Sequence, residues 1–252
     1  MIGAPRGPAY DVPVTEPDLA THPVAAPDAA WRPMPIGTGD PRKIRDVIAE
    51  PHWGGRRVLV AIRAGEATLT DEDGAPIPGL EALHEALVAA VVGTDHVVLD
   101  GQLLAGPLGD GTGAFANVGM DSVATPGQMG RQLLLGGSSR LDRRRESAAA
   151  IEARGVPPET GGPAAFVAID LLLLDATSLL GIPLLERKRL LESVLEESEA
   201  VRRTVAVRPP IEAWYSQWRA LGFREVVLKS ANGRYTPGTP AADWATLVIP
   251  TR

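Results

Sequence analysis

The strongest constraint on the fold is the segment 166–174, which reads FVAIDLLLL and is apolar apart from Asp170. A run of this kind is typical of a β-strand that is covered on both faces. Apolar runs at 96–100 and 224–228 predict two further buried strands. The chain must therefore fold around a sheet that has other elements packed on it.

Hairpins are predicted around these strands. The segments 57–62 and 67–70 are strand-like and flank a short turn, and Asp73-Gly74 gives a second turn signal. We expect an antiparallel meander here. A short strand is predicted at 205–207.

Helical spacing of apolar residues predicts helices between the strands, at 79–92, 183–197 and 211–221. Asp40-Pro41 is a helix-start signal, and Ile44, Val47 and Ile48 follow it with helical spacing, so we also expect a short helix that ends near Pro51. Because strands and helices are intermixed, the predicted class is α+β, built on antiparallel sheets flanked by helices.

Two regions do not fit this pattern. Residues 1–38 carry many prolines, which interrupt both helix and sheet hydrogen bonding, so we expect an extended or disordered leader followed by one domain at 39–252. Residues 105–164 are rich in Gly and Pro and are expected to form an enlarged, partly irregular insertion.

Composition excludes several kinds of site. The 252-residue chain has no cysteine and four scattered histidines, so disulfides, thiolate chemistry and a zinc site are not expected. No apolar run is long enough to cross a membrane and no signal peptide is present, which predicts a cytoplasmic protein. The net charge is -6, so any nucleic-acid binding requires a local basic patch.

Two groups of residues have both a structural and a functional interpretation. The basic stretch 140–154 includes Arg140, Arg143, Arg144 and Arg145 among acidic residues; a solvated helix face is the simpler interpretation, and a phosphate-binding patch is the alternative. Trp214 and Trp218 lie one helical turn apart, where a role in the core is favoured over an exposed binding stripe.

Five segments together suggest a family. A Pro33-Met34 pair precedes EPHWGGRR at 50–57; VLDGQ follows at 98–102, IDLLLLD at 169–175, GFREVVLK at 222–229, and YTPG at 235–238 with Trp244 beyond it. In order and spacing these segments resemble the motifs of ATP-dependent DNA ligases, especially the ligase domain of bacterial end-joining ligases. The resemblance covers roughly residues 33–248.

The resemblance implies an ATP-grasp-like DNA ligase nucleotidyltransferase fold, and it assigns positions in a nucleotide pocket. The family's lysine nucleophile, which attacks the α-phosphate of ATP, aligns with His52. The other pocket positions are Glu50, Gly54, Gly55, Arg57, Gln102, Ile169, Arg224, Lys229, Thr246 and Val248.

Most of these positions have lost the chemistry of the family. Gly54 stands for an aspartate that contacts the ribose, and Gln102 for a glutamate that binds the ribose and helps place the metal; an amide lacks the charge that Mg²⁺ prefers. Four further replacements have the same effect. Ile169 stands for the adenine-stacking phenylalanine, Arg224 for a metal-linked glutamate, and Thr246 and Val248 for the two triphosphate lysines. Glu225 follows Arg224, on the opposite strand face.

The resemblance therefore predicts a ligase-like protein without catalysis. We expect no bound metal or cofactor, and a binding or scaffold role with a protein partner, in a DNA-repair context by fold analogy. The alternative is an unorthodox or partner-completed nucleotidyltransferase that uses ATP, Mg²⁺ and His52 or a second chain. The chain ends at Arg252, where the OB-fold domain of the family would begin, so no OB-fold domain is expected.

Six residues in or beside the pocket carry further expectations. Arg57 and Lys229 either keep a residual anion site, with Arg56 and Arg224 adding charge, or pair with a carboxylate such as Asp100, Asp170 or Glu225. His52 is expected to fill a vacated pocket rather than to act as a nucleophile. We also expect Ile169, Leu228 and Val248 to partly close the cleft.

Overall fold

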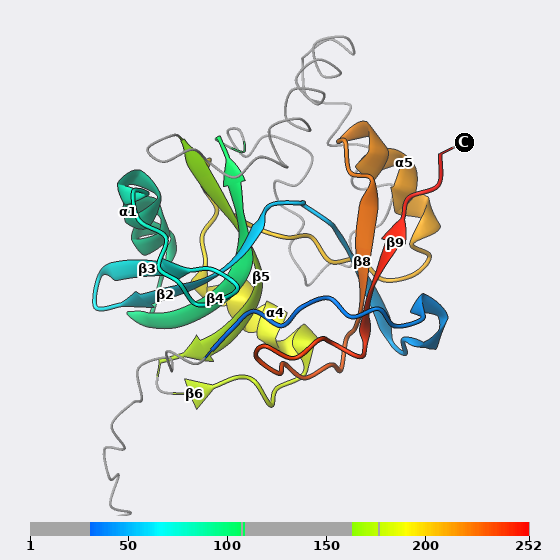
Figure 1. Ribbon diagram of the computed structural model, residues 1–252, viewed down its shortest axis with the longest axis horizontal. Coiled ribbons are helices and arrows are strands. Elements are labelled where there is room, and N and C mark those ends of the chain that lie inside the picture. The colour runs from blue at the N-terminus through cyan, green and yellow to red at the C-terminus, as the bar shows by residue number, and fades with distance from the viewer. Residues whose placement is uncertain (1–30, 107, 109–162, 176, 252) are drawn as a thin grey trace, which may run out of the picture.

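The protein folds around two β-sheets, which a computed structural model describes for residues 31–106, 108, 163–175 and 177–251 (Figure 1). The larger sheet has six strands in the order β3-β2-β4-β5-β6, with β7 added to β5, and the smaller has three in the order β1-β8-β9. This confirms the predicted α+β class. The insertion predicted at 105–164, with the arginines at 140–145, lies almost wholly outside the described residues.

The six-stranded sheet contains the strand from which the sequence argument started. That strand is β5 (Ala164–Leu174), and it is buried along nearly its whole length. It pairs antiparallel with β4 (His96–Ala105), which pairs with β2 (Arg56–Arg63), which pairs with β3 (Glu66–Thr70). The short strands β6 (Thr177–Ser178) and β7 (Val201–Arg203) complete the sheet, β7 in parallel with β5.

One face of this sheet is covered by two helices, α1 (Glu81–Ala90) and α4 (Leu184–Val194) (Figure 1). Leu83 and Leu87 of α1 and Leu191 of α4 join one apolar core with alternate residues of β2 and β4, such as Val58, Val60 and Leu99. Because strand side chains alternate between faces, Arg57, Asp100 and Gln102 lie on the other face, toward the small sheet.

The three-stranded sheet consists of β1 (Val47–Pro51), β8 (Glu225–Ser230) and β9 (Trp244–Val248). The helix α5 (Glu212–Ala220) packs on one side of it, and Trp214 and Trp218 join a core with Ala49, Val226 and Leu228. Both tryptophans are buried, so their predicted core role is confirmed. The opposite side of the small sheet faces the six-stranded sheet.

Two local predictions were wrong. Asp40 does cap a helical turn, but this is only the 3-10 helix η1 (Pro41–Lys43), and the residues expected to continue it form β1. The turn ends at Ile44, whose backbone is extended, and pairing of the following residues with β8 then buries Ile48 and Ala49 on opposite faces of β1. The strand predicted at 205–207 is reduced to a single bridge from Val207 to Ala49.

The end of the proline-rich leader packs against the domain. Residues 31–38 have no regular secondary structure, and the described Met34 is 2% exposed in a core with Leu59, Val98 and Trp244. Residues 1–30 lie outside the described residues, so the domain boundary at 38/39 stays a prediction.

In the described ranges, no helix is long and apolar enough to cross a membrane.

Candidate functional site

The candidate site lies where the two sheets face each other. Glu50 of β1, Val227 and Lys229 of β8 and Trp244 of β9 share one face of the small sheet, because Glu50 pairs with Val227 and Lys229 with Trp244. Arg57, Gln102 and Ile169 face them from the large sheet. Together these residues line a pocket whose other walls are Ile36, Pro51, His52 and Trp53.

The pocket is small. It measures about 260 Å³ including its open mouth, and the volume that the centre of a water molecule could occupy is about 10 Å³. Sites for small molecules usually measure roughly 300–1,000 Å³. One water needs about 10–15 Å³ of volume that its centre can occupy. The side chains in place therefore leave room for at most about one water.

Glu50 forms ion pairs with two ammonium groups at the floor of the pocket. Its Oε2 atom lies 2.7 Å from Lys229 Nζ and its Oε1 atom 2.5 Å from Lys188 Nζ. All three side chains are almost fully buried. Burial alone would raise the pKa of Glu50, but the attraction of the two lysines outweighs it and the pKa lies below its ordinary value.

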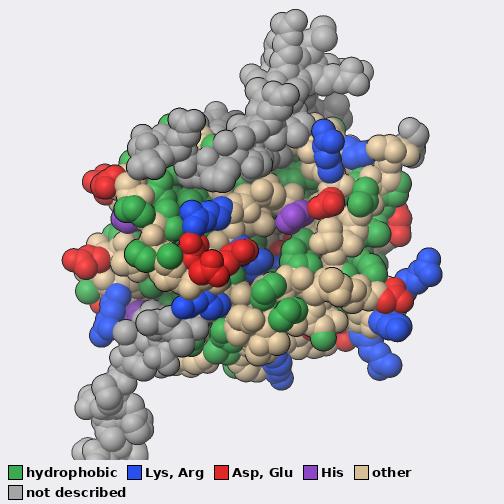
Figure 2. Space-filling model, in the orientation of Figure 1, with side chains coloured by type: hydrophobic (Ala, Val, Ile, Leu, Met, Phe, Trp, Pro, Cys, Tyr) green, Lys and Arg blue, Asp and Glu red, His purple; other side chains and the backbone are tan. Residues whose placement is uncertain are grey.

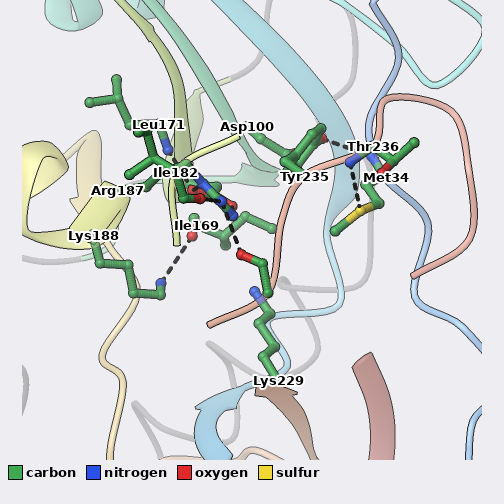
Figure 3. A network of polar contacts seen from close by, with 12 residues as sticks. Met34, Asp100, Ile169, Leu171, Ile182, Arg187, Lys188, Lys229, Tyr235 and Thr236 are labelled. Carbon is green, nitrogen blue, oxygen red and sulfur yellow. Dashed lines mark hydrogen bonds and ion pairs between the residues drawn. The ribbon is translucent and has the colours of Figure 1, made fainter. Parts of the chain in front are cut away.

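Lys229 shows the opposite balance. Burial is the largest effect on its amine, and the neighbouring Lys188 and Arg57 add to it, so that the contact with Glu50 only partly compensates and the pKa falls to about 8. The ammonium also lies 4.0 Å from the centre of the Trp244 ring, a cation–π contact. Lys188 reaches in from α4 and also donates to the Ile169 carbonyl at 2.9 Å (Figure 3).

Arg57 is bound by Asp100 beside the pocket. Its Nε and one terminal nitrogen donate to the two oxygens of Asp100, at 2.5 and 2.6 Å, and the pKa of Arg57 is raised because the attraction of Asp100 outweighs burial. The Tyr235 hydroxyl donates to Asp100 at 2.6 Å and accepts from the Met34 amide at 2.7 Å (Figure 3). Burial, then the charge of Asp100, raises the pKa of Tyr235 well above its ordinary value.

A third buried ion pair joins Asp170 of β5 to Arg187 of α4. Two guanidinium nitrogens donate to the carboxylate at 2.8 and 2.7 Å, and both side chains are 0% exposed. Arg187 also donates to the carbonyls of Ile182 and Gly233 (Figure 3). The aspartate that the sequence placed in a fold-shaping motif thus fixes α4 against the sheet.

His52 lies at the mouth of the pocket. Its Nδ1 atom is 3.1 Å from Glu225 Oε2, and both side chains are partly exposed, at 28% and 40%. Glu225 shares the pocket-side face of β8 with Val227 and Lys229, whereas its neighbour Arg224 is exposed and does not line the pocket. The residue next to His52 is therefore Glu225, not Arg224.

Gln102 is a buried amide in the pocket wall, and its Oε1 atom has no hydrogen-bond partner among the described residues. The glycines nearby have different roles. A Cβ at Gly55 would lie 2.4 Å from the Leu103 carbonyl oxygen, so only glycine fits there. Gly54 has a positive φ of 75° and open space around it, so glycine is favoured there by its backbone conformation and not by a lack of room.

The outer pocket positions are not part of the closed site. Thr246 and Val248 do not line it; both are exposed, Val248 at 64%. Of the three residues expected to close the cleft, only Ile169 does so. Leu228 packs on the α5 side of the small sheet, and the closure comes from Ile36, Val227 and Trp244 instead.

The pairing of the two retained cations is now defined. Arg57 pairs with Asp100, as one of the two alternatives stated, whereas Lys229 pairs with Glu50, which was not among the named partners. Arg56, expected to add charge, pairs with Asp71 at 2.6 Å.

Lys188 was missed by the sequence argument, although a signal for it exists. Leu184, Lys188 and Leu191 share the buried face of α4, so a lysine among leucines on a core-facing stripe marks a charge that needs a buried partner. Trp53 was missed as well; its indole donates to Thr204 at 3.0 Å and its ring meets Phe223 edge-on.

No cluster of three or more His, Asp or Glu side chains that could hold a metal ion occurs among the described residues. The two carboxylates nearest to the pocket are each bound to cations of the protein, Glu50 to two lysines and Asp100 to Arg57. These carboxylates do not fit a Mg²⁺ ion without first giving up those partners. The charged groups of the pocket are thus paired with one another within the protein.

Comparison with known proteins identifies the fold. Residues 139–247 match the family model described as the ATP dependent DNA ligase domain. None of the curated proteins compared with the chain matches it significantly.

Two solved structures from mycobacteria resemble the chain. They are a mycobacterial DNA ligase D complexed with ATP and MES (TM-score 0.56, 24% identity) and the ligase domain of LigD from M. tuberculosis (TM-score 0.54, 23% identity). Each match covers 87% of this chain, and 60% and 59% of the respective relative. The described part of the chain thus has the fold of the nucleotidyltransferase domain of ATP-dependent DNA ligases, and residues 139–247 match the ATP-dependent DNA ligase domain family.

Proposed function

We propose that this ligase-like domain does not take up AMP at His52 and acts as a binding or scaffold module. A protein partner fits the acidic net charge of -6, and fold analogy points to DNA repair as the context. The proposal rests on one observation above the others: every charged side chain that lines the pocket already has a partner within the protein.

This internal pairing opposes the binding of ATP with Mg²⁺. A triphosphate with Mg²⁺ needs cations and carboxylates that are free to receive it. Lys229 and Arg57 instead bind Glu50 and Asp100 at 2.5 to 2.7 Å, and Trp244 and Ile36 occupy the space between the sheets. Binding would have to break buried ion pairs, which costs about 3–5 kcal/mol for each one broken.

The mouth of the pocket supports the same conclusion. The two positions that carry triphosphate-binding lysines in the resembling family hold Thr246 and Val248 here, and both are exposed. Glu225 adds a carboxylate beside His52. An acidic mouth repels a triphosphate, and a neutral one does not attract it as a lysine-lined mouth would.

The charges on one face of the molecule support a protein partner. On the face shown in Figure 2, acidic and basic side chains of the described residues are interspersed and form no continuous basic area. A protein partner therefore fits better than a nucleic acid, whose phosphates require clustered Lys and Arg. The alternative nucleic-acid patch at Arg140, Arg143, Arg144 and Arg145 lies outside the described residues.

An adenylation assay tests the proposal. The purified protein is incubated with ATP and Mg²⁺ or Mn²⁺, and its intact mass is recorded beside those of His52→Ala and His52→Lys. We expect an unchanged mass for wild type. A gain of one AMP that disappears in His52→Ala would overturn the proposal and establish a histidine nucleophile.

A second candidate function is an enzyme completed by another chain. It is favoured by the fold, which is similar to that of the ligase domains of mycobacterial DNA ligase D. The His52→Lys variant separates the candidates: if restoring the lysine alone allows adenylation, the pocket still accepts ATP and a completing subunit becomes the better explanation. If the His52→Lys protein also stays unmodified, the whole pocket, and not only position 52, has lost the ability to react with ATP.

A further inference from the structure

The strand β9 forms one border of the small sheet, and its backbone groups alternate in direction. Ile249 donates to the carbonyl of Arg224 at 2.8 Å, and Ser230 donates to the carbonyl of Asp243 at 3.1 Å. In an antiparallel pair every second residue exchanges such hydrogen bonds with the neighbouring strand. Residues 245 and 247 therefore turn their N–H and C=O groups toward β8, and residues 244, 246 and 248 turn theirs away from it.

Thr246 and Val248 present unpaired backbone groups at this border. The order of the small sheet ends at β9, and among the described residues no hydrogen bond reaches the N–H or C=O group of either residue. Trp244 differs, because the chain at Gly37 and Gly39 covers its outward side; a Cβ on Gly37 would lie 3.5 Å from the Trp244 carbonyl oxygen. The open part of the border is thus the second half of β9.

The strand β9 also lacks the features that usually protect such a border. Edge strands commonly carry charged side chains, prolines or bulges that prevent pairing with another chain. Residues 244–249 read WATLVI and contain no charge, proline or glycine. Val248 is 64% exposed, more than any other large apolar side chain among the described residues. A segment of this composition at an open border favours the addition of another β-strand.

The surroundings of this border are positively charged. Arg42 and Lys43 belong to η1, which lies beside β9, and Arg45 follows two residues later (Figure 1). Arg224 lies at the other end of β9, opposite Ile249. All four cations are exposed, and none of their side chains has an ion pair or hydrogen bond with another described residue. Their charges can therefore receive the carboxylates of a partner.

The carboxylates nearby have other contacts. Asp40 caps η1 through its side chain, and Asp46 accepts from Asn232. Glu225 pairs with His52. In the part of the chain that the structure describes, none of these three carboxylates forms an ion pair with the four cations. A second copy of this chain does not fit the border, because pairing of β9 with β9, in either direction, brings these like charges together.

We propose that an acidic, extended peptide segment of a partner protein adds to the small sheet at β9. Its backbone pairs with the N–H and C=O groups of Thr246 and Val248, and one of its apolar side chains packs on Val248. Its carboxylates, on either side of this apolar part, meet Arg224 and the cations of η1. Such a segment specifies the protein partner of the proposed binding role and rests on that role.

Selection from a phage-displayed library of random nonapeptides tests the proposal on the full chain. Wild type and Thr246→Pro are immobilised in parallel. Proline removes the N–H group that points away from β8 and leaves the hydrogen bonds to β8 in place, and a melting curve checks that the variant is folded. We expect wild type to enrich peptides with acidic ends and alternating β-branched or aromatic residues, and Thr246→Pro not to enrich them.

An enriched peptide, labelled with fluorescein, then gives dissociation constants by fluorescence anisotropy. Binding to Thr246→Pro should be at least about tenfold weaker than to wild type, and Thr246→Ser, which keeps the N–H group, should bind within about twofold of wild type. Replacing Arg42 and Arg45 together by glutamate should weaken binding at least about fivefold at low salt, and by less at high salt.

Changes in the peptide test the same contacts without altering the protein, and they decide the question if Thr246→Pro does not fold. Methylation of the backbone nitrogens that face β9 should abolish binding to wild type, whereas methylation of the alternate nitrogens should not. Enrichment of basic or uncharged peptides, no enrichment over folded Thr246→Pro, or equal binding of the two methylated peptides would refute the proposal.

Sedimentation of the protein alone separates the remaining occupant. A wild-type dimer that Thr246→Pro converts to a monomer would also refute the proposal, because a second copy would then occupy β9. Adenylation is measured at His52 and not at β9, so failure of the peptide to bind leaves the test of the proposed function unaffected.

Discussion

Replacing Glu50 by glutamine probes the pocket floor most directly. The substitution keeps the shape of the side chain and removes the carboxylate that contacts both Lys188 and Lys229. Breaking a buried ion pair from one side costs about 3–5 kcal/mol, because the remaining charge is left in a low-dielectric interior. We expect a loss of that size in the free energy of unfolding at pH 7.

The loss in the free energy of unfolding has an upper bound for each lysine, because an unpaired buried lysine can lose its proton and become neutral. At pH 7 this costs about 5 kcal/mol for an amine whose unfolded pKa is 10.5, at about 1.4 kcal/mol for each pH unit. Between pH 7 and pH 9 that cost falls by about 2.7 kcal/mol. Wild type gains only about 1.4 kcal/mol over the same range, because its Lys229 already deprotonates near pH 8.

The expected result is therefore a penalty that shrinks by at least about 1 kcal/mol from pH 7 to pH 9. Urea unfolding followed by fluorescence of the five tryptophans measures it at both pH values. Glu225→Gln is the matched control, because its pair with His52 is partly exposed and should cost less than about 1 kcal/mol. A Glu50→Gln penalty below 1 kcal/mol, or one independent of pH, would refute the reasoning.

Three further predictions follow from the same contacts. Asp170→Asn should cost about 3–5 kcal/mol in urea unfolding because Arg187 is fully buried, while Arg189→Met, at the exposed pair with Glu186, should change stability by less than about 0.5 kcal/mol; equal effects would contradict this. Gly101→Ala should lower the melting temperature, at a cost of about 1–3 kcal/mol, because a Cβ there lies 2.4 Å from the Phe166 ring, and Gly181→Ala, with open space, should not. Finally, wild type should gain stability from pH 8 to 10.5: the folded pKa of Lys229, about 8, lies below the unfolded value of 10.5, so the unfolded state binds more protons in that window. Lys229→Met should lack this gain, and an identical pH profile would show that Lys229 does not titrate there.

The large sheet was predictable from sequence because its strands carry their own signal. An apolar run such as 166–174 has few alternatives to a central strand, and the hairpin from β2 to β3 has turn residues at the right place. The small sheet was harder. Val47–Pro51 has helical as well as strand spacing of its apolar residues, and only pairing with β8, far along the chain, decides between them.

The site was predictable in its positions and not in its contacts. Motif spacing assigned His52, Arg57, Gln102, Ile169 and Lys229 to one nucleotide pocket; the structure places them around one pocket, and its role as a nucleotide site stays a prediction. It did not indicate which carboxylate each cation binds, because Glu50 and Lys229 are joined across two strands that are distant in sequence. Lys188 was overlooked for the same reason, since its partner lies on another element.

These contacts also explain which pocket residues were retained. Glu50 of the small sheet is bound by Lys188, which belongs to the helix packed on the large sheet. In the same way, Asp100 of the large sheet is bound by Tyr235, from the loop that follows β8. One buried ion pair and one buried hydrogen bond thus connect the two sheets, and losing one partner of a buried ion pair leaves an uncompensated charge in the core.

The exposed positions carry no such constraint. Thr246 and Val248 stand at the mouth, where replacing a lysine leaves no buried charge unpaired. Retention of Arg57 and Lys229 therefore follows from their place between the sheets and is not evidence that a nucleotide binds. This interpretation is distinguishable by experiment: if Lys229 is kept for the fold, Lys229→Met should reduce stability in the absence of any nucleotide, and adding ATP should not raise the melting temperature of wild type.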